Sequence, residues 1–393
     1  MERQPTLRIG VIGTRGIGNV QGGIERYCSS FYSELCRYGF HATVFVRRAS
    51  PREGTLPGVS LCRVPVPRFR SFETILHSIA SICVARVLGI RTIHVHGIGS
   101  CLAVPLARVL GMRVIVRHLG ADYERDKWGM LAKALLRAGE RYAARYAESV
   151  VCLNQHIAAE FSRATGRFDG IHVVPNGVEA PPAALLPRIH DRLGIAAGTY
   201  VLAVGRLVPE KNMHVLVPAF LHADLSHSVK LVIVGDYDYR GAYSRALKAL
   251  CARDKRIVMT GPVFGEELWS LYAKAGLFVL PSSHEGMSFS LLEAARAGTK
   301  IIASDIPANS FVCREFIRLV PVNSITALGD AIGGEWIRVR SPAEIARQVD
   351  CCKVQHDWPS IARQMAPLLA GRDGHGLGAT EYHLPHSKED PLT

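Results

Sequence analysis

The sequence contains ten cysteines but no C-x-x-C pair, and only Cys351 and Cys352 are adjacent. Structural zinc sites and the disulfide frameworks of secreted proteins both depend on closely spaced cysteines. The scattered cysteines therefore argue against either kind of site. We expect reduced thiols and a cytoplasmic protein.

A membrane-spanning run of apolar residues is also missing. The best candidates, Ile75 to Ile90 and Ile98 to Met112, are interrupted by His77, Arg86 and Arg108, whereas a transmembrane helix needs about 20 mainly apolar residues. The charged N-terminus leads directly into a strand-like run, so we expect no signal peptide. Any contact with a membrane would then be peripheral, on the inner face of the cytoplasmic membrane.

Lysine is absent from residues 1–91, where thirteen arginines face only five acids, an excess of +8 within a total net charge of +13. Such an excess is typical of proteins that bind phosphorylated small molecules, anionic lipid or nucleic acid. A solvated basic face explains the charge equally well. No helix-turn-helix, zinc-finger or RNA-binding signature accompanies it, so we expect no nucleic-acid partner.

Strand-like apolar runs alternate with amphipathic stretches along the chain, which predicts an α/β fold of parallel sheets covered by helices. A length of 393 residues favours two domains. A proline-rich break after Asn176-Gly177 separates them, and the linker is expected near residues 176–198. We predict domains at 1–177 and 178–355 and a disordered tail at 371–393.

One strand–loop–helix segment combines acids with a predicted anion site. It reads PSSHEGMSFSLLEAARAG, from Pro281 to Gly298. The start of its helix would direct free N–H groups at a phosphate. The acids would repel phosphate but accept hydrogen bonds from sugar hydroxyls. A nucleotide-sugar, which has a diphosphate and hydroxyls, satisfies both groups of residues: the amides of Met287, Ser288, Phe289 and Ser290, and the carboxylates of Glu285 and Glu293.

A second loop presents two cations. In AVGRLVPEKN, Arg206 and Lys211 are five residues apart after a predicted strand. Arg206 could bind a diphosphate with two hydrogen bonds while Lys211 acts as a point charge. An ordinary solvated pair is the alternative. The acidic segment favours the interpretation that Arg206 and Lys211 bind a ligand. Both loops follow predicted strands, and open parallel sheets bind ligands at the carboxyl ends of their strands.

The first strand leads into a glycine-rich loop, GTRGIGNVQGGIERY. Its spacing is not G-x-G-x-x-G, and the second strand ends in Arg47-Arg48 instead of the acid that holds an adenosine ribose. Both features argue against a nicotinamide-dependent dehydrogenase. Gly22 and Gly23 instead bring bare backbone to a helix N-terminus, where a ligand phosphate can approach. A tight turn is the alternative.

These motifs together resemble the retaining glycosyltransferases of family 4. The resemblance rests on VGRLVPEKN and EGMSFSLLEA in the second half, and on GTRG…GGIERY and VRHLGADYERDKWG in the first half, and it extends over about residues 7–370. The first-half motifs are similar to a bacterial subgroup that makes surface polysaccharides, with rhamnosyltransferase-like members. The resemblance implies a GT-B fold of two facing Rossmann-like domains with an interdomain cleft, and a helix at 356–370 that crosses back to the first domain.

The resemblance also implies roles for individual residues. Arg206 and Lys211 would hold the donor diphosphate, Glu293 the nucleotide ribose, and Glu285 would lie by the donor sugar. The family often has Gly-Phe-Gly after the first acid, whereas this chain has Gly286-Met287-Ser288. The contacts of this loop with the donor sugar therefore depart from the family pattern.

Three histidines follow or occupy predicted strands. His118 comes at the end of one, where family members often have a histidine near the donor sugar, and we interpret it as catalytic, with a structural role as the alternative. His94 and His96 share one strand face. They lack a third ligand at suitable spacing, so we interpret them as packing or cleft-lining residues.

The function predicted from this evidence is retaining transfer of a sugar from a nucleotide diphosphate sugar to a glycan acceptor, expected to be lipid-linked. We expect no cofactor and no metal, because Arg206, Lys211 and helix amides would stabilise the leaving diphosphate. Glu285 could act as a nucleophile or assist front-face substitution. The open alternatives are a sugar-nucleotide 2-epimerase and a non-catalytic glycan-assembly subunit. An anionic membrane surface is an expected partner of Arg63, Arg68 and Arg70.

Overall fold

A computed structural model describes residues 7–18, 22–47, 56–67, 73–125, 128–185, 188–237 and 241–371. The predicted tail, apart from Gly371, lies outside them. The chain divides into two compact units, the first holding residues 24–175 and 359–371 with the N-terminal strand, the second holding residues 22–23 and 176–358. The predicted linker at 176–198 is part of the second unit and contains helix α6. The described residues include no helix long and apolar enough to cross a membrane.

The first unit is built on a parallel sheet of seven strands in the order β3-β2-β1-β4-β5-β6-β7. Its central strands are buried, as expected when helices cover both faces of a parallel sheet. The strands are β1 (Leu7–Ile12), β2 (Phe40–Arg47), β3 (Val59–Val64), β4 (Thr92–His96), β5 (Arg113–His118), β6 (Ser149–Cys152) and β7 (Ile171–Val173).

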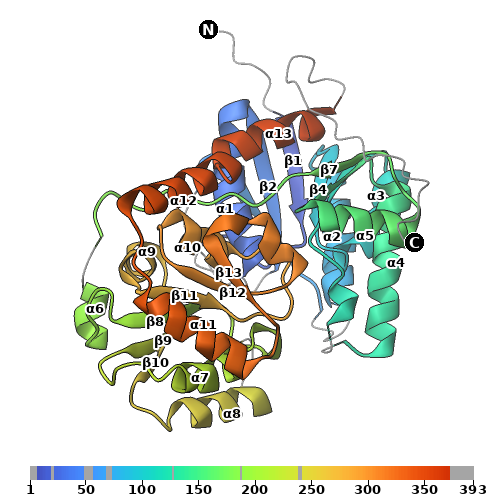
Figure 1. Cartoon of the computed structure of the whole chain (residues 1–393). Coiled ribbons are helices and arrows are strands. Elements are labelled where there is room, and N and C mark those ends of the chain that lie inside the picture. Colours follow the sequence, from blue (N-terminus) through green and yellow to red (C-terminus); the bar gives the residue numbers. More distant parts are fainter. Residues whose placement is uncertain are drawn as a thin grey trace, which may run out of the picture. The chain divides into compact units, whose positions relative to one another are not determined.

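Helices lie on both faces of this sheet (Figure 1). His96 pairs in register with Arg117, and both side chains point to the face covered by α1. The next residue, His118, points to the opposite face, where α4 and α5 pack, because side chains alternate along a strand. The helices are α1 (Gly23–Leu35), α2 (Glu73–Val87), α3 (Val104–Val109), α4 (Met130–Tyr146), α5 (Gln155–Thr165) and α13 (Trp358–Ala370), with 3₁₀ turns η1 (Cys36–Tyr38), η2 (Ser100–Ala103) and η3 (Asp122–Glu124).

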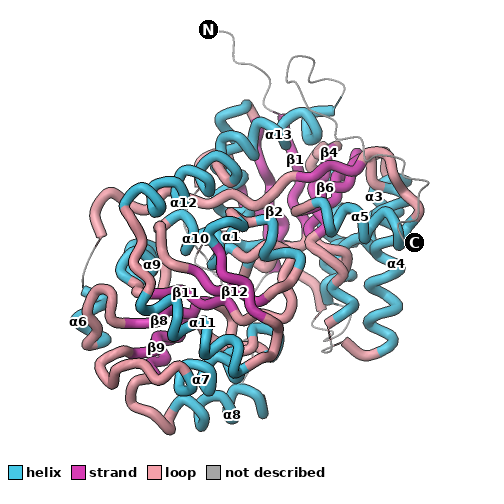
Figure 2. The backbone as a smooth tube through the Cα atoms, viewed as in Figure 1, coloured by secondary structure: helices cyan, strands magenta, loops and turns pink. Residues whose placement is uncertain are grey.

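The second unit contains a parallel sheet of six strands in the order β10-β9-β8-β11-β12-β13. Figure 2 shows its strands β8, β9, β11 and β12 beside one another. The strands are β8 (Tyr200–Val204), β9 (Lys230–Val234), β10 (Ile257–Gly261), β11 (Leu277–Leu280), β12 (Ile301–Ser304) and β13 (Ile317–Val320). The helices are α6 (Arg188–Leu193), α7 (Met213–His222), α8 (Ala242–Cys251), α9 (Gly265–Lys274), α10 (Phe289–Arg296), α11 (Ile325–Ile337) and α12 (Pro342–Gln355), with turns η4 (Pro209–Lys211), η5 (Pro307–Phe311) and η6 (Arg314–Phe316).

The pairing of β8 with β11 places the two predicted ligand loops at one sheet edge. Val201 pairs with Leu277 and Leu202 with Phe278, in parallel register. Both strands are almost fully buried, with Leu216 and Phe220 of α7 in the same core. The loops that follow β8 and β11 therefore leave the sheet side by side, where open α/β sheets bind ligands. The predicted fold class, with two parallel sheets covered by helices, is confirmed.

Candidate active site

Two predicted site residues in the second unit form an ion pair. The Nζ atom of Lys211, at the end of η4, donates a hydrogen bond to Oε1 of Glu285, in the loop after β11. The side chains are only 13% and 10% exposed. Little water therefore screens the attraction between the two side chains. The structure thus joins the cation predicted for the diphosphate to the acid predicted for the donor sugar.

The loops that carry this pair are also joined through their backbones. Ser283 donates its N–H to the carbonyl oxygen of Glu210 over 3.0 Å. The side chain of Asn212 donates to the carbonyl of Pro281 over 3.0 Å and to Oδ1 of Asn323 over 2.9 Å. Asn212 has a φ of 50°, a left-handed conformation that asparagine tolerates better than most residues. These contacts hold the Lys211 and Glu285 loops in one arrangement.

The N-terminus of α10 lies directly after the Glu285 loop. Ser288 is its N-cap residue but makes no side-chain cap, because the Ser288 hydroxyl is hydrogen-bonded to the Ser290 hydroxyl over 2.9 Å. The first amides of a helix lack intrahelical acceptors, and the helix dipole makes this end favourable for an anion. Glu293, one turn into α10, is 1% exposed. Two of the predicted amide donors, Phe289 and Ser290, and the second acid therefore belong to one short helix, and the other two donors, Met287 and Ser288, directly precede it.

Asn176 is a contact of this loop that sequence reasoning missed. Its backbone N–H points at the sulfur of Met287 over 3.2 Å, and its side-chain Nδ2 donates to the Met287 carbonyl over 3.0 Å. Asn176 is itself held by His356, whose Nδ1–H donates to the Asn176 carbonyl over 2.9 Å. Burial lowers the pKa of His356 to about 4, so this histidine is neutral near pH 7. The sequence indicated Asn176 only as part of a linker.

Trp358 packs against the same linker. A Cβ atom on Gly177 would lie 2.3 Å from Cδ2 of Trp358, so only glycine fits there. The Trp358 ring also stacks on Phe289, with centroids 6.5 Å apart. The backbone N–H of Val178 donates to the carbonyl of His356 over 2.8 Å. The residues that enter and leave the second unit therefore lie against each other and against the first residue of α10.

His118, the predicted catalytic histidine, is buried in the first unit with both ring nitrogens hydrogen-bonded. The N–H of Gly120 donates to its Nδ1 over 3.3 Å, so the proton is on Nε2, which donates to Glu140 of α4 over 2.9 Å. Both side chains are under 5% exposed. Sequence reasoning missed Glu140, although an acid on the apolar side of a predicted helix was a usable signal. The catalytic role of His118 stays a prediction.

His94 and His96 form a buried cluster with α1, consistent with packing. The Tyr32 hydroxyl is hydrogen-bonded to Nδ1 of His94 and to Nε2 of His96, each over 2.8 Å. Burial, with the nearby Arg117 charge, lowers the pKa of His94 to about 3. Within the described ranges, no group of three or more histidine, cysteine or acidic residues is arranged to hold a metal ion.

Gly22 and Gly23 lie at the start of α1, as predicted. Gly22 has a φ of 155° and Gly23 is the first residue of the helix. In the same turn, Glu25 is 3% exposed and accepts hydrogen bonds from the backbone N–H of Arg15 over 3.0 Å and from its Nε over 3.2 Å. The phosphate contact predicted for the two glycines stays a prediction. The second residue of the Arg47-Arg48 pair lies outside the described residues.

Two sequence families match consecutive parts of the chain. Residues 22–177 match the glycosyl transferase 4-like domain, and residues 198–334 match glycosyl transferases group 1. The chain is similar to the GDP-mannose-dependent alpha-(1-6)-phosphatidylinositol monomannoside mannosyltransferase of Mycolicibacterium smegmatis, with 26% identity over 90% of this chain and 96% of that protein. It is also similar to the Escherichia coli UDP-Gal:alpha-D-GlcNAc-diphosphoundecaprenol alpha-1,3-galactosyltransferase, with 30% identity over 41% of this chain and 44% of that protein.

The fold resembles that of sucrose-phosphate synthase from Thermosynechococcus elongatus, with a TM-score of 0.77 and 21% identity over 92% of this chain and 98% of that chain. Two Rossmann-like units with parallel sheets are the GT-B fold. The chain belongs to the family 4 glycosyltransferases of this fold and is a transferase enzyme.

Proposed function

We propose that this protein transfers a sugar, with retention of anomeric configuration, from a nucleotide diphosphate sugar to a glycan acceptor carried on a lipid. The observation that carries the proposal is the Lys211–Glu285 ion pair beside the uncapped N-terminus of α10. A diphosphate with an attached sugar matches this arrangement, because the cation and amides suit phosphate and the acid suits hydroxyls.

In the proposed mechanism, Lys211 leaves Glu285 for the donor diphosphate, and Arg206 and the α10 amides complete the anion site. Glu285 then accepts a hydrogen bond from the donor sugar, and Glu293 from the ribose. Charge that develops on the leaving diphosphate is stabilised by groups already in place, which lowers the barrier to transfer. No metal ion is needed at the diphosphate in this scheme.

The names of two relatives support the substrate classes. One relative is named as GDP-mannose-dependent and acts on a phosphatidylinositol mannoside, and the other is named for UDP-Gal and a diphosphoundecaprenol acceptor. Both names pair a nucleotide-sugar with a lipid-linked acceptor. We therefore place the protein in bacterial surface polysaccharide synthesis, acting at the cytoplasmic face of a membrane.

The basic loop expected to contact that membrane is only partly described. Arg68 and Arg70 lie outside the described residues, and Arg63 is half-buried on β3. The membrane contact of this loop stays a prediction.

The test begins with thermal shift of the protein in UDP-, GDP- and dTDP-sugars. A donor at about a hundred times its dissociation constant should stabilise the fold by roughly 2.7 kcal/mol. The stabilising donor is then incubated with and without membrane-extracted glycolipid, and the product's anomeric configuration is read by NMR. A glycosylated lipid with the donor's configuration is expected. Release of an epimerised sugar from donor alone would instead identify a 2-epimerase, and donor binding without turnover a non-catalytic subunit.

A further inference from the structure

Helix α4 of the first unit has a fixed inner face. Gly139, Glu140 and Ala143 are buried, and Glu140 bonds His118. The packing at Gly139 is so close that a Cβ atom would lie 2.2 Å from the carbonyl oxygen of Ile98. The rotation of α4 about its axis is therefore set, and its opposite face points outward beside α3 and α5 (Figure 1).

The outer face carries a row of cations that we call the basic stripe: Lys133, Arg137, Arg141 and Arg145. These residues recur every four positions, a spacing that puts neighbouring side chains on one side of a helix. The three arginines are exposed. None of the four forms an ion pair with any acid in the described part of the chain. Like charges at this spacing destabilise a helix slightly, so the stripe is better accommodated when an anionic surface lies against it.

The N-terminal end of α4 adds exposed apolar side chains. Met130 is 90% exposed, Leu131 70%, and Trp128, which precedes the helix, 37%. Met130 and Arg137 are seven residues apart, so they lie on the same side of the helix. We call these three residues the apolar tip. Helices that lie in a membrane interface likewise combine cationic side chains with exposed apolar ones.

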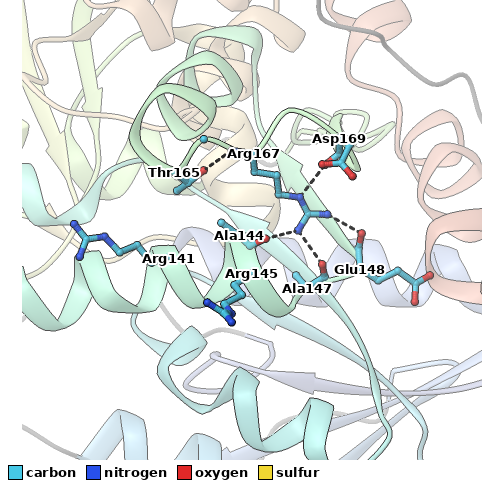
Figure 3. Close-up of a pocket in the computed structure, with 9 residues that line it drawn as sticks. Arg141, Ala144, Arg145, Ala147, Glu148, Thr165, Arg167 and Asp169 are labelled. Atoms are coloured by element: carbon cyan, nitrogen blue, oxygen red, sulfur yellow. Dashed lines mark hydrogen bonds between the residues drawn. The ribbon is translucent and has the colours of Figure 1, made fainter.

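A hollow at the C-terminal end of α4, about 520 Å³ in volume, includes the last two cations of the stripe. Figure 3 shows Arg167 in this hollow hydrogen-bonded to main-chain carbonyls, including those of Ala144 over 3.1 Å and Ala147 over 2.8 Å. Arg167 thus caps the helix. Arg141 and Arg145 point away from these bonds, and both are exposed.

The acids beside the hollow do not neutralise the stripe. The carboxylate of Glu148 is paired with Arg113 over 2.7 Å, and Asp169 lies on the Arg167 side of the hollow. Phosphate groups are the complementary ligand for two guanidinium groups left in this position, because guanidinium binds phosphate with two parallel hydrogen bonds.

We propose that α4 is the surface by which the protein docks on an anionic lipid membrane. The basic stripe contacts the lipid phosphates, and the apolar tip enters the boundary between headgroups and acyl chains. The inference rests on the proposed function, since a lipid-linked acceptor brings the enzyme to a membrane. Nucleic acid fits the stripe but not the tip, because exposed Met130 and Leu131 gain nothing from a phosphate backbone.

The experiment is co-sedimentation of the full chain with vesicles of phosphatidylcholine alone and of phosphatidylcholine mixed with phosphatidylglycerol. We expect binding to the mixed vesicles only, and weaker binding as salt is raised. Each basic residue near an anionic surface contributes roughly a fivefold gain in partitioning. The variant with Arg137→Gln, Arg141→Gln and Arg145→Gln should therefore lose roughly a hundredfold in partitioning.

Two further variants make the test specific. The matched control removes three exposed cations of the second unit, with Arg318→Gln, Arg347→Gln and Lys353→Gln. It makes the same change in net charge and should bind mixed vesicles within about twofold of the wild type. The tip variant, with Met130→Ser and Leu131→Ser, should lose the part of binding that persists at high salt, since apolar insertion is not screened.

Several outcomes would overturn the inference. They are equal binding to both vesicle types, an unchanged stripe variant, an equal loss in the matched control, or displacement from vesicles by an oligonucleotide at equal phosphate concentration.

Thermal shift with the stabilising nucleotide-sugar separates this inference from the proposed function. A wild type that binds donor and transfers sugar but ignores vesicles refutes the docking surface alone. A wild type that binds mixed vesicles but no nucleotide-sugar refutes the proposed function alone.

Discussion

Asn176 holds Met287 at two points, with its backbone N–H on the sulfur and its side-chain amide on the carbonyl oxygen. The two residues are 111 positions apart in the sequence. Met287 is adjacent to the N-cap of α10. Asn176 therefore fixes the backbone that presents the amides proposed to bind the donor diphosphate.

Asn176→Ala should raise the donor KM roughly fivefold with little change in kcat. A net hydrogen bond is worth about 1 kcal/mol, and the freed loop must be ordered again by the donor. Steady-state kinetics measure the split. The matched control is Asn154→Ala, which removes the cap bond to Ile157 in the first unit and should lower Tm without changing the KM. Equal effects of both variants on KM would contradict a positioning role.

Lys211→Met should both destabilise the protein and weaken donor binding. It leaves Glu285 nearly buried without its cation, and an uncompensated buried charge is costly. The double variant Lys211→Met with Glu285→Gln should recover much of the stability, because both charges are gone, but none of the donor affinity. Chemical denaturation and donor titration measure the two effects. Recovery of donor affinity in the double variant would exclude the phosphate role of Lys211.

Arg206→Ala should weaken donor binding by roughly ten- to a hundredfold, because hydrogen bonds to charged groups are worth about 1.5–3 kcal/mol. Titration with the nucleoside diphosphate and with the nucleoside monophosphate provides the internal control. The loss should be larger for the diphosphate. An equal loss for both nucleotides would place Arg206 away from the second phosphate.

The two acids should differ in kinetics. Glu293→Gln should mainly raise the donor KM, since a ribose contact is similar in the ground and transition states, whereas Glu285→Gln should mainly lower kcat. Both substitutions preserve the shape of the side chain, and a measurement of the stability of each variant controls for misfolding. Indistinguishable kinetic effects would remove this division of roles.

Protonation of His356 should destabilise the protein in acid. Its pKa is about 4 in the folded protein and near 6.5 when unfolded, so the unfolded state takes up the proton first. The stabilising effect of the neutral ring is complete above about pH 6.5 and is lost as pH falls to about 4, on the order of 3 kcal/mol. His356→Asn retains a donor for the Asn176 carbonyl and should flatten this part of the stability profile. Urea denaturation at several pH values checks the difference, and parallel profiles for the two proteins would contradict it.

Sugar transfer should persist in EDTA, because the proposed anion site uses Lys211, Arg206 and helix amides instead of a divalent cation. Initial rates before and after chelation, with Mn²⁺ added back, measure this directly. Loss of activity in chelator with recovery in Mn²⁺ would require a metal site at the diphosphate.

The continuous apolar runs predicted most of the sheets. The apolar runs Leu7–Ile12 and Leu277–Leu280 in the sequence coincide with strands β1 and β11. Strands β3, β7 and β13 were not predicted, because exposed or half-exposed positions interrupt their apolar pattern. Local pattern was sufficient where a strand is buried on both faces and insufficient at three of the four sheet edges, β10 being the edge strand that was predicted.

The candidate site likewise has parts that could be predicted from the sequence and parts that could not. The loops of Lys211 and Glu285 could be predicted, since each follows a recognisable strand. Their ion pair could not, because it depends on β8 pairing in register with β11, between residues 76 positions apart. Asn176 and Glu140 were missed for a related reason, as each acquires its role from a partner distant in sequence.

The side-by-side passage of the linker and the segment before α13 has a topological consequence. Apart from residues 22–23, the second unit is one continuous segment from Asn176 to Trp358, and the ends of this segment touch where Trp358 packs on Gly177 and Val178 pairs with Asp357. This segment is arranged as an inserted domain, with the first unit before and after it in the sequence. Domain insertion and circular permutation are tolerated when the ends of the inserted segment lie close together. The ends of the segment that holds the proposed donor residues could therefore be joined in a circular permutant with its sheet intact.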